Sequence, residues 1–383
     1  MHYHDALYGD VSLPDVIGEL ADTPEVQRLH HISQDTIPRK CIPWGAVSRF
    51  EHSMGVCSLS TLVLQRNPLP EREARLLPIA ALLHDAGNPC FSHLTEPFLK
   101  ELTGKDGESF LEETLHNTTA DAILDAEGFS LEEVVRWVTG YAKPLSLVLN
   151  GTMDIDNLDN VNRYWFTARN GEILFDAPSI ASSFIFNQTT QAWELDDRCF
   201  AETEKWQDAR GKVYGLVYGD PHQNACMMLY RAVAIAFARG EIQKWFFHLT
   251  DNEALEYLGS QCNPNSSRLA KRVAYRVWHK EVFSIETTAP SPRLRKFCEP
   301  WDARTIIADH LCKELHLPLR AICAYVGKGK DKRRIELPFV DKHGVRRFDH
   351  DRHDPIYRVK IYIDPEFEIT EEEIERSVRC IIS

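Results

Sequence analysis

The sequence lacks the features by which several classes of protein are recognised. Its ten cysteines include no Cys-x-x-Cys pair, which excludes the usual zinc-finger spacing and a small secreted disulfide framework. Reduced thiols in a cytosol fit this cysteine usage best. The chain has no run of 18 apolar residues, and its N-terminus has no basic segment followed by an apolar one. We therefore expect a cytoplasmic protein with no membrane span and no membrane partner.

The sequence also has no excess of basic residues, no internal repeat and no low-complexity tract. Its formal net charge of −13 argues against broad binding to nucleic acids or membrane surfaces. The hydrophobic fraction of 43% and the charged fraction of 26% are those of an ordinary globular protein. A length of 383 residues suits one large domain with appendages, or two domains.

Helical periodicity dominates the first three quarters of the chain. A β-hairpin is nevertheless expected within 181–198, where two apolar runs flank the polar segment 187–190. A helix is expected at about 50–65, followed by a loop at 67–71 and a second helix that ends at residue 85. Further helices are expected at 107–125, 129–140, 155–169, 200–218, 221–247 and 251–285.

The last quarter of the chain has a different pattern. Three prolines between 290 and 300 mark a boundary. Beyond it, a helix at 305–315 and an acidic C-terminal helix accompany strand-like runs at 320–326, 335–340 and 357–363. We predict a mostly α fold, with a helical domain over 1–285 that carries the hairpin insertion 181–198. A smaller α+β part is expected over 301–383.

Side chains that bind metal ions are concentrated between residues 49 and 96. His52 lies in a polar segment, and a buried helix then ends at His84 and Asp85. Adjacent residues point about 100° apart in mid-helix, so His84 and Asp85 can converge only at the last turn. The helix-stop signals Gly87 and Pro89 place them there. The alternative is a buried histidine beside a capping aspartate.

Asp156, about seventy residues later, is a fourth candidate ligand. Two imidazoles and two carboxylates form a mixed nitrogen and oxygen set that suits a divalent ion such as Mn, Fe, Ni, Co, Zn or Mg. Such a set leaves coordination positions open for water and substrate, as a catalytic metal requires.

Several short motifs stand out along the chain. They are YGDVSL at 8–13, DTPEVQRL at 22–29, RFEHSMGV at 49–56, LLHDAG at 82–87, FSH at 91–93 and DIDNLD at 154–159. Together they resemble those of the HD-superfamily phosphohydrolases, in particular the deoxynucleoside triphosphate triphosphohydrolase branch. The resemblance is strong over about 5–165, weaker over 210–285 and faint beyond 300. It implies an HD-domain helical core, a divalent metal cofactor and a possible homo-oligomer.

The resemblance also implies roles for individual residues. The metal ligands would be His52, His84, Asp85 and Asp156, with Asp154 and Asp159 as helix-capping or supporting groups. Arg49 would face the substrate phosphates, or alternatively form a surface ion pair with Glu51. His116 occupies the place of a histidine that protonates the leaving oxygen, and the alternative is a plain exposed histidine. Glu96 could orient water or His116, and His93 could contact phosphate or a second metal, or form a structural hydrogen bond.

The sequence departs from the triphosphohydrolase branch at the residues that hold the triphosphate. Asn157 and Asn160 stand where that branch has a lysine and a tyrosine, and an arginine of the branch has no clear counterpart. Arg163, Lys212 or Arg231 are candidates to compensate. We count Asn157, Asn160 and Arg163 with Arg49 as candidate substrate-binding residues.

We expect metal-dependent hydrolysis of a phosphate ester, with a nucleotide as the leading substrate. The alternatives are a phosphomonoesterase or phosphodiesterase acting on a less charged substrate, and a metal-binding regulatory module without turnover. Basic clusters at 328–334 and 346–353 are either solvated loops or sites that bind an anion or a second copy, which leaves nucleic acid open as a partner.

Overall fold

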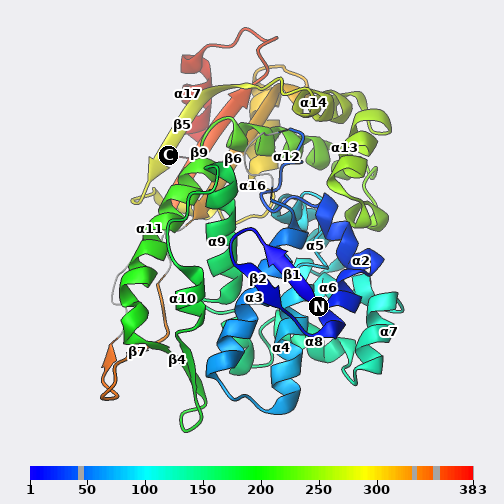
Figure 1. Cartoon of the computed structure of the whole chain (residues 1–383). Helices are drawn as coiled ribbons and strands as arrows, with labels where there is room; N and C mark the ends of the chain where they lie inside the picture. Colours follow the sequence, from blue (N-terminus) through cyan, green and yellow to red (C-terminus); the bar gives the residue numbers. More distant parts are fainter. Residues whose placement is uncertain (42–46, 330–333, 348–353, 383) are drawn as a thin grey trace.

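The structure is a computed structural model that describes residues 1–41, 47–329, 334–347 and 354–382. In Figure 1 the helices before residue 140 lie in the lower part of the view, and the helices of residues 222–274 lie in the upper part, next to the three-stranded sheet. The predicted helical core, hairpin insertion and α+β C-terminal part are confirmed. Most of the second basic cluster (348–353) and the middle of the first (330–333) lie outside the described residues. The division of the chain between 285 and 301 stays a prediction.

The helical core is built from the first 274 residues. Its order is β1 (His2–Asp5), β2 (Gly9–Ser12), α1 (Asp15–Ala21), α2 (Pro24–Gln27), α3 (Arg49–Arg66), α4 (Glu71–Leu83), α5 (Glu96–Thr103), α6 (Gly107–Leu115), α7 (Thr119–Ala126), α8 (Leu131–Val138), α9 (Ile155–Ala168), α10 (Ala177–Ala181), β3 (Phe184–Asn187), β4 (Ala192–Asp196), α11 (Phe200–Val217), α12 (His222–Ala238), α13 (Asp251–Ser260) and α14 (Pro264–Ala274).

The remainder of the chain forms a sheet with helices on it. Its elements are β5 (Lys280–Thr287), α15 (Pro292–Phe297), α16 (Ala303–Glu314), β6 (Ile322–Gly329), β7 (Phe339–Val340), β8 (Arg346–Arg347), β9 (Ile356–Ile363) and α17 (Glu371–Ile382). The strand order is β5-β9-β6, antiparallel throughout. The strands β7 and β8 instead extend the hairpin β3–β4 into a four-stranded sheet, so the 335–340 run does not belong to the C-terminal sheet.

Two predicted helices end earlier than expected, and each has a physical reason. The helix predicted over 251–285 is two helices followed by β5, whose residues alternate polar and apolar and pair along β9. The helix predicted over 221–247 ends at Ala238 because Gly240 adopts a left-handed conformation (φ 72°) and its N–H bonds back to the carbonyl of Phe237. The pattern at 107–125 is likewise divided, at the positive φ of Asn117.

Three helices bring the predicted ligands together. The helix α3 begins at a capping box, in which Ser48 and Glu51 satisfy each other's backbone N–H groups, and this fixes the first turn that carries His52. The helix α4 is buried along residues 76–83 and packs against α3. The helix α9 starts at its N-cap Asp154 and packs across α3.

Candidate metal centre

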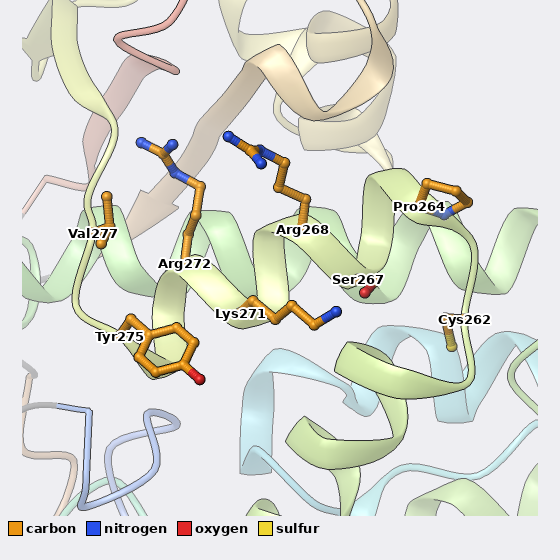
Figure 2. Close-up of a pocket in the computed structure, with 8 residues that line it drawn as sticks. All are labelled: Cys262, Pro264, Ser267, Arg268, Lys271, Arg272, Tyr275 and Val277. Atoms are coloured by element: carbon orange, nitrogen blue, oxygen red, sulfur yellow. The ribbon is translucent and has the colours of Figure 1, made fainter.

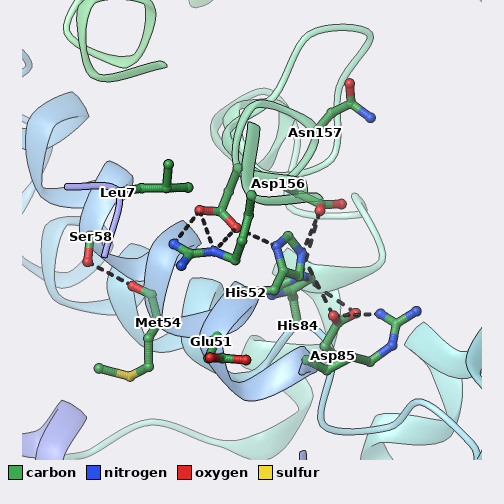
Figure 3. Close-up of polar contacts among 12 residues, drawn as sticks. Leu7, Glu51, His52, Met54, Ser58, His84, Asp85, Asp156 and Asn157 are labelled. Atoms are coloured by element: carbon green, nitrogen blue, oxygen red, sulfur yellow. Dashed lines mark hydrogen bonds and ion pairs between the residues drawn. The ribbon is translucent and has the colours of Figure 1, made fainter. Parts of the chain in front are cut away.

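The polar side chains of the centre converge from α3, the end of α4 and α9 (Figure 3). One ligand atom each from His52, His84 and Asp85 lies within 4.8 Å of the others. The two Nε2 atoms of the histidines are 3.2 Å apart. Asp156 Oδ1 lies 3.0 Å from His52 Nε2 and 3.8 Å from His84 Nε2. The structure therefore brings together all four predicted ligands, three of them buried and Asp156 partly exposed.

The hydrogen bonds of the two imidazoles indicate that this set fits a cation. His84 Nδ1 lies 2.8 Å from the carbonyl of Ala81, and His52 Nδ1 lies 2.7 Å from Asp159 Oδ2. Each Nδ1 therefore carries the proton in the neutral ring, and each Nε2 presents a lone pair. Two lone pairs and a carboxylate oxygen then face one another, which is repulsive unless a proton or a metal ion lies among them.

A proton can take that place on His52. Burial disfavours the imidazolium, but the carboxylates of Asp156 and Asp159 outweigh this effect and raise the pKa of His52 to about 9. For Asp85 the neighbouring charges are positive, and they lower its pKa. Burial works against its charge, but Arg49 and the two histidines hold the pKa of Asp85 below its usual range. The charged forms of His52 and Asp85 are both favoured, so these side chains together stabilise a positive charge placed among them.

Asp159 supports His52 and is itself held by two further residues. Arg163 donates to both oxygens of Asp159, and its Nη2 donates to Asp5 at 2.8 Å. These groups are buried, and they pack against Gly55 of α3, where an added Cβ would lie 2.1 Å from Asp159 Oδ1. Arg163 therefore forms a buried structural ion pair, and this geometry gives no support to its predicted role in substrate binding.

The other aspartate of the DIDNLD motif has a different task. Asp154 accepts from the backbone N–H of Asn157 and caps α9. This agrees with the choice of Asp156 over its two neighbours as the ligand.

Arg49 lies against the metal centre and not on the surface. Its Nη1 is 2.6 Å from Asp85 Oδ2, and its Nε donates to Ser92. Its Nη2 is buried and has no hydrogen-bond partner among the described residues. The ion pair with Glu51 is absent, because Glu51 caps α3 and lies near Arg39. A guanidinium with one free edge beside a ligand carboxylate is suited to an oxyanion.

His93 and Glu96 form a pair. His93 Nδ1 lies 2.9 Å from Glu96 Oε2, and Glu96 raises the pKa of His93. The other oxygen of Glu96 lies near Gly107, the first residue of α6, since an added Cβ there would be 2.7 Å from it. Asn88 lies at the same place and donates to Asp85 at 2.5 Å.

His116 is not brought to this group. It follows the C-terminal end of α6, whereas the N-terminal end of that helix contacts Glu96 and Asn88. Nine residues of helix separate the two ends by about 13 Å. The His116 side chain is 67% exposed and has Asp121 as its ion-pair partner. The residues that follow His116, Asn117 to Thr119, differ from those of the triphosphohydrolase branch, whereas His93 lies beside Glu96.

A pocket of about 320 Å³ adjoins the centre between α9, α11 and α12. Asn157 and Asn160 line it, as predicted, and His93 lies at its edge; Asn157 projects from α9 away from the ligands (Figure 3). Two arginines that the sequence analysis missed, Arg210 of α11 and Arg304 of α16, also line it. The volume falls in the range of small-molecule sites.

Arg210 and Arg304 form no ion pair with a carboxylate in the part of the chain that the structure describes. Arg210 donates to Asn157 at 2.5 Å, and its Nε is buried without a partner there. Arg304 lies over the ring of Tyr325, 4.8 Å from its centroid. Arg231, in contrast, is paired with Asp309. No local motif marks the two pocket arginines, because they reach it from helices far along the chain.

A second pocket, of about 580 Å³, runs along α14 and is lined by none of the predicted site residues (Figure 2). Its arginines Arg268 and Arg272 are paired with Glu366 and Asp364. Among the described helices, none combines the length and the apolarity that a membrane crossing requires.

The residues of this centre lie within a segment of the chain that is similar to known proteins. Residues 49–161 match the family model of the HD domain. The deoxynucleoside triphosphate triphosphohydrolase SAMHD1 homolog of Dictyostelium discoideum is 28% identical over 181 residues, which are 42% of this chain and 35% of that protein. The SAMHD1 triphosphohydrolase of Gallus gallus is 28% identical over 151 residues, 36% of this chain and 25% of that protein. The chain thus spans about a third or less of the length of these two relatives.

Solved structures show the fold over nearly the whole chain. A hypothetical protein from Aquifex aeolicus superposes with a TM-score of 0.76 at 21% identity, covering 99% of both chains. A phosphohydrolase from Bacteroides thetaiotaomicron gives 0.71 at 16% identity, covering 95% of this chain and 99% of that one. The motifs, the convergent His and Asp side chains and the family match together show that the chain contains an HD domain at residues 49–161.

Proposed function

We propose that this protein hydrolyses a phosphate ester in a metal-dependent reaction, and that the substrate is a nucleotide. The observation that carries the proposal is the pair of Nε2 lone pairs of His52 and His84, 3.2 Å apart beside Asp85 and Asp156. The HD-domain match and the triphosphohydrolase relatives support it.

The four ligands would be His52, His84, Asp85 and Asp156, holding Mn, Fe, Ni, Co, Zn or Mg. The chemistry that a divalent ion supplies in such a site is a water of lowered pKa and a polarised phosphoryl oxygen. Asp159 fixes the tautomer of His52 by accepting from its Nδ1, so that Nε2 stays available. The carbonyl of Ala81 does the same for His84.

The cations around the centre suit phosphate oxygens. Arg49 has a free Nη2 beside Asp85, and Arg210 and Arg304 reach the adjoining pocket without carboxylate partners among the described residues. Hydrogen bonds of guanidinium groups to phosphate are charge-assisted and directional. These three arginines supply the charge that Asn157 and Asn160 do not.

His93 is the proton donor that the geometry favours. It lies at the edge of the pocket, and Glu96 both orients its ring and raises its pKa. A protonated imidazole can donate to the leaving oxygen as the P–O bond breaks. Glu96 acts through His93, so it is a positioning residue.

A less charged substrate is the second candidate. Asn157 and Asn160 offer neutral amides where a triphosphate site would use charge, and Arg163 and Arg231 are held by aspartates. A phosphomonoester or a phosphodiester fits this distribution. A regulatory module without turnover would retain the metal and bind the same ligand.

A substrate screen on the purified protein separates these candidates. It offers ribonucleoside and deoxynucleoside tri- and monophosphates, cyclic dinucleotides and a generic phosphate ester, each with Mn²⁺, Mg²⁺, Ni²⁺ or Co²⁺, with product chromatography. Release of triphosphate or phosphate from a nucleotide supports the proposal. Hydrolysis of the generic ester alone favours the second candidate, and absence of turnover with bound metal contradicts the enzymatic function.

A further inference from the structure

The pocket of about 580 Å³ along α14 has a positively charged wall. Arg268, Lys271 and Arg272 line it, and none of the described residues that line it carries a carboxylate. Residues three and four positions apart lie on one face of a helix, so the three cations share one face of α14. Figure 2 shows the guanidinium groups of Arg268 and Arg272 pointing to the same side of the helix. We call this cavity the α14 pocket.

The carboxylate of Glu366 lies among three guanidinium groups, two of which belong to this pocket. Arg268 forms an ion pair with its Oε1, and Arg272 Nη1 lies 3.7 Å from the same oxygen. Arg320 Nη2 lies 3.5 Å from its Oε2. The Glu366 side chain is 43% exposed and belongs to the segment between β9 and α17. It can therefore leave this position by rotating about its own side-chain bonds.

Positive charges outnumber negative ones around Glu366. Asp364 is the second carboxylate, 3.2 Å from Arg272 Nη1, so three arginines and Lys271 face two carboxylates. Lys271 has no ion-pair or hydrogen-bond partner in the described part of the chain, and Arg272 Nε is buried without a partner there. Burial and the charges of Arg272 and Arg320 lower the pKa of His279 to about 3, so this imidazole lies in the same positive field.

We propose that the α14 pocket binds the phosphate group of a small anionic ligand, which displaces Glu366 from the three arginines. This inference goes beyond the proposed function, because the pocket shares no residue with the metal centre and no turnover is involved. A phosphate group has more acceptor oxygens and more negative charge than a carboxylate, so it satisfies more guanidinium N–H groups. The pocket volume suits a small molecule, and the net charge of −13 disfavours an extended polyanion such as nucleic acid.

The test is equilibrium binding of inorganic pyrophosphate to the purified full chain, measured by calorimetry at constant ionic strength, before and after loading with Mn²⁺. Binding at the α14 pocket should not require the metal. In Glu366→Gln the competing charge is removed, and binding should tighten about threefold to fivefold. In Lys271→Gln a cation is removed, and binding should weaken by about the same factor. The matched control is Lys313→Gln, an exposed lysine on α16, which should leave the affinity unchanged.

Tighter binding in Glu366→Gln together with weaker binding in Lys271→Gln supports the inference, and a gain of affinity cannot come from misfolding. Failure of Glu366→Gln to tighten binding overturns it, as does absence of pyrophosphate binding to the unmutated protein. A nucleoside diphosphate titrated in parallel separates an esterified phosphate from a free one, because only the ligand that occupies this pocket responds to both substitutions. Hydrolysis is not measured, so failure here leaves the proposed function intact.

Discussion

The Nε2 atoms of His52 and His84 face each other at 3.2 Å, and each ring is held by a hydrogen bond that leaves its lone pair at this contact. Two acceptors this close repel each other unless a cation lies among them. Asp85 and Asp156 lie next to His52 Nε2, where their carboxylates would share the same cation.

We expect His84→Ala and Asp85→Ala to lose both metal retention and hydrolysis. Each change removes a ligand atom from the group, and the remaining set is too small for a stable catalytic site. Elemental analysis of the purified variants, next to a phosphate-release assay, measures both properties. His343→Ala, which changes an exposed histidine outside the centre, is the matched control. A metal-free Asp85→Ala protein that still turns over would refute the assignment.

Metal affinity should depend on pH through His52. Its pKa of about 9 means that a proton occupies Nε2 at neutral pH in the metal-free protein and must leave when metal binds. Apparent affinity should therefore rise about tenfold per pH unit up to about pH 9 and level off above it. Calorimetric titration with Mn²⁺ across this range tests the slope. An affinity that is flat between pH 6 and 8 would show that His52 is not protonated.

The same proton contributes to the stability of the metal-free protein. The pKa of His52 in the folded state lies above the unfolded value of about 6.5, so this stabilisation is fully present below that value. It is lost as the pH rises towards about 9. Added metal should offset the loss, because it binds only the folded state. Thermal unfolding at pH 6.5 and pH 9, with and without Mn²⁺, measures both effects.

Asp159→Asn should weaken the metal centre without removing a ligand. The amide is a poorer acceptor for His52 Nδ1–H, and its neighbour Arg163 loses a carboxylate partner. Metal affinity should fall by about tenfold to a hundredfold. Competition with a chelator of known affinity is the measurement. Retention of the original affinity would mean that Asp159 serves folding alone.

Arg163→Met should destabilise the fold by about 3–5 kcal/mol, because Asp159 and Asp5 are left buried without their partner. Gly55→Ala should be destabilising for the same reason, since its Cβ would displace the ion pair. Denaturant unfolding of the metal-free proteins gives both values. A change of less than 1 kcal/mol in either variant would contradict the structural role of Arg163.

His93→Ala should lower turnover more than His116→Ala, while both proteins keep their metal. Both side chains are exposed, but His93 lines the pocket and pairs with Glu96, whereas His116 lies about 13 Å away along α6 and pairs with Asp121. Steady-state kinetics, with metal content checked for each variant, decide between them. A larger effect at His116 would restore the proton donor that the motif alignment suggested.

Site residues could be predicted from the sequence where a local pattern marks them, and not where only tertiary packing brings them together. The ligands His84 and Asp85 were recognisable because the helix-stop signals put them at one helix end. The supporting role of Arg163 was also readable, since it stands four residues after Asp159 on one helix face. Arg210 and Arg304 could not be found that way, because only tertiary packing brings their segments to one pocket.

The strand at 280–287 was missed although a local pattern for it is present in the sequence. Its alternation of polar and apolar residues is present in the sequence, but the segment directly follows two helices, so helical periodicity predicts that the helix continues through it. Pairing with β9, whose partner residues lie 70 to 83 positions later, decides its structure. Long-range pairing overrides local appearance in strands more often than in helices.

The most direct test of the central claim is a phosphate-release assay on one preparation, measured first with Mn²⁺, then after chelation and then after Mn²⁺ is restored, with His84→Ala in parallel. The account predicts hydrolysis of at least one nucleotide that disappears on chelation, returns with the metal and is absent from the variant. Turnover that persists in the chelated protein or in His84→Ala would contradict it.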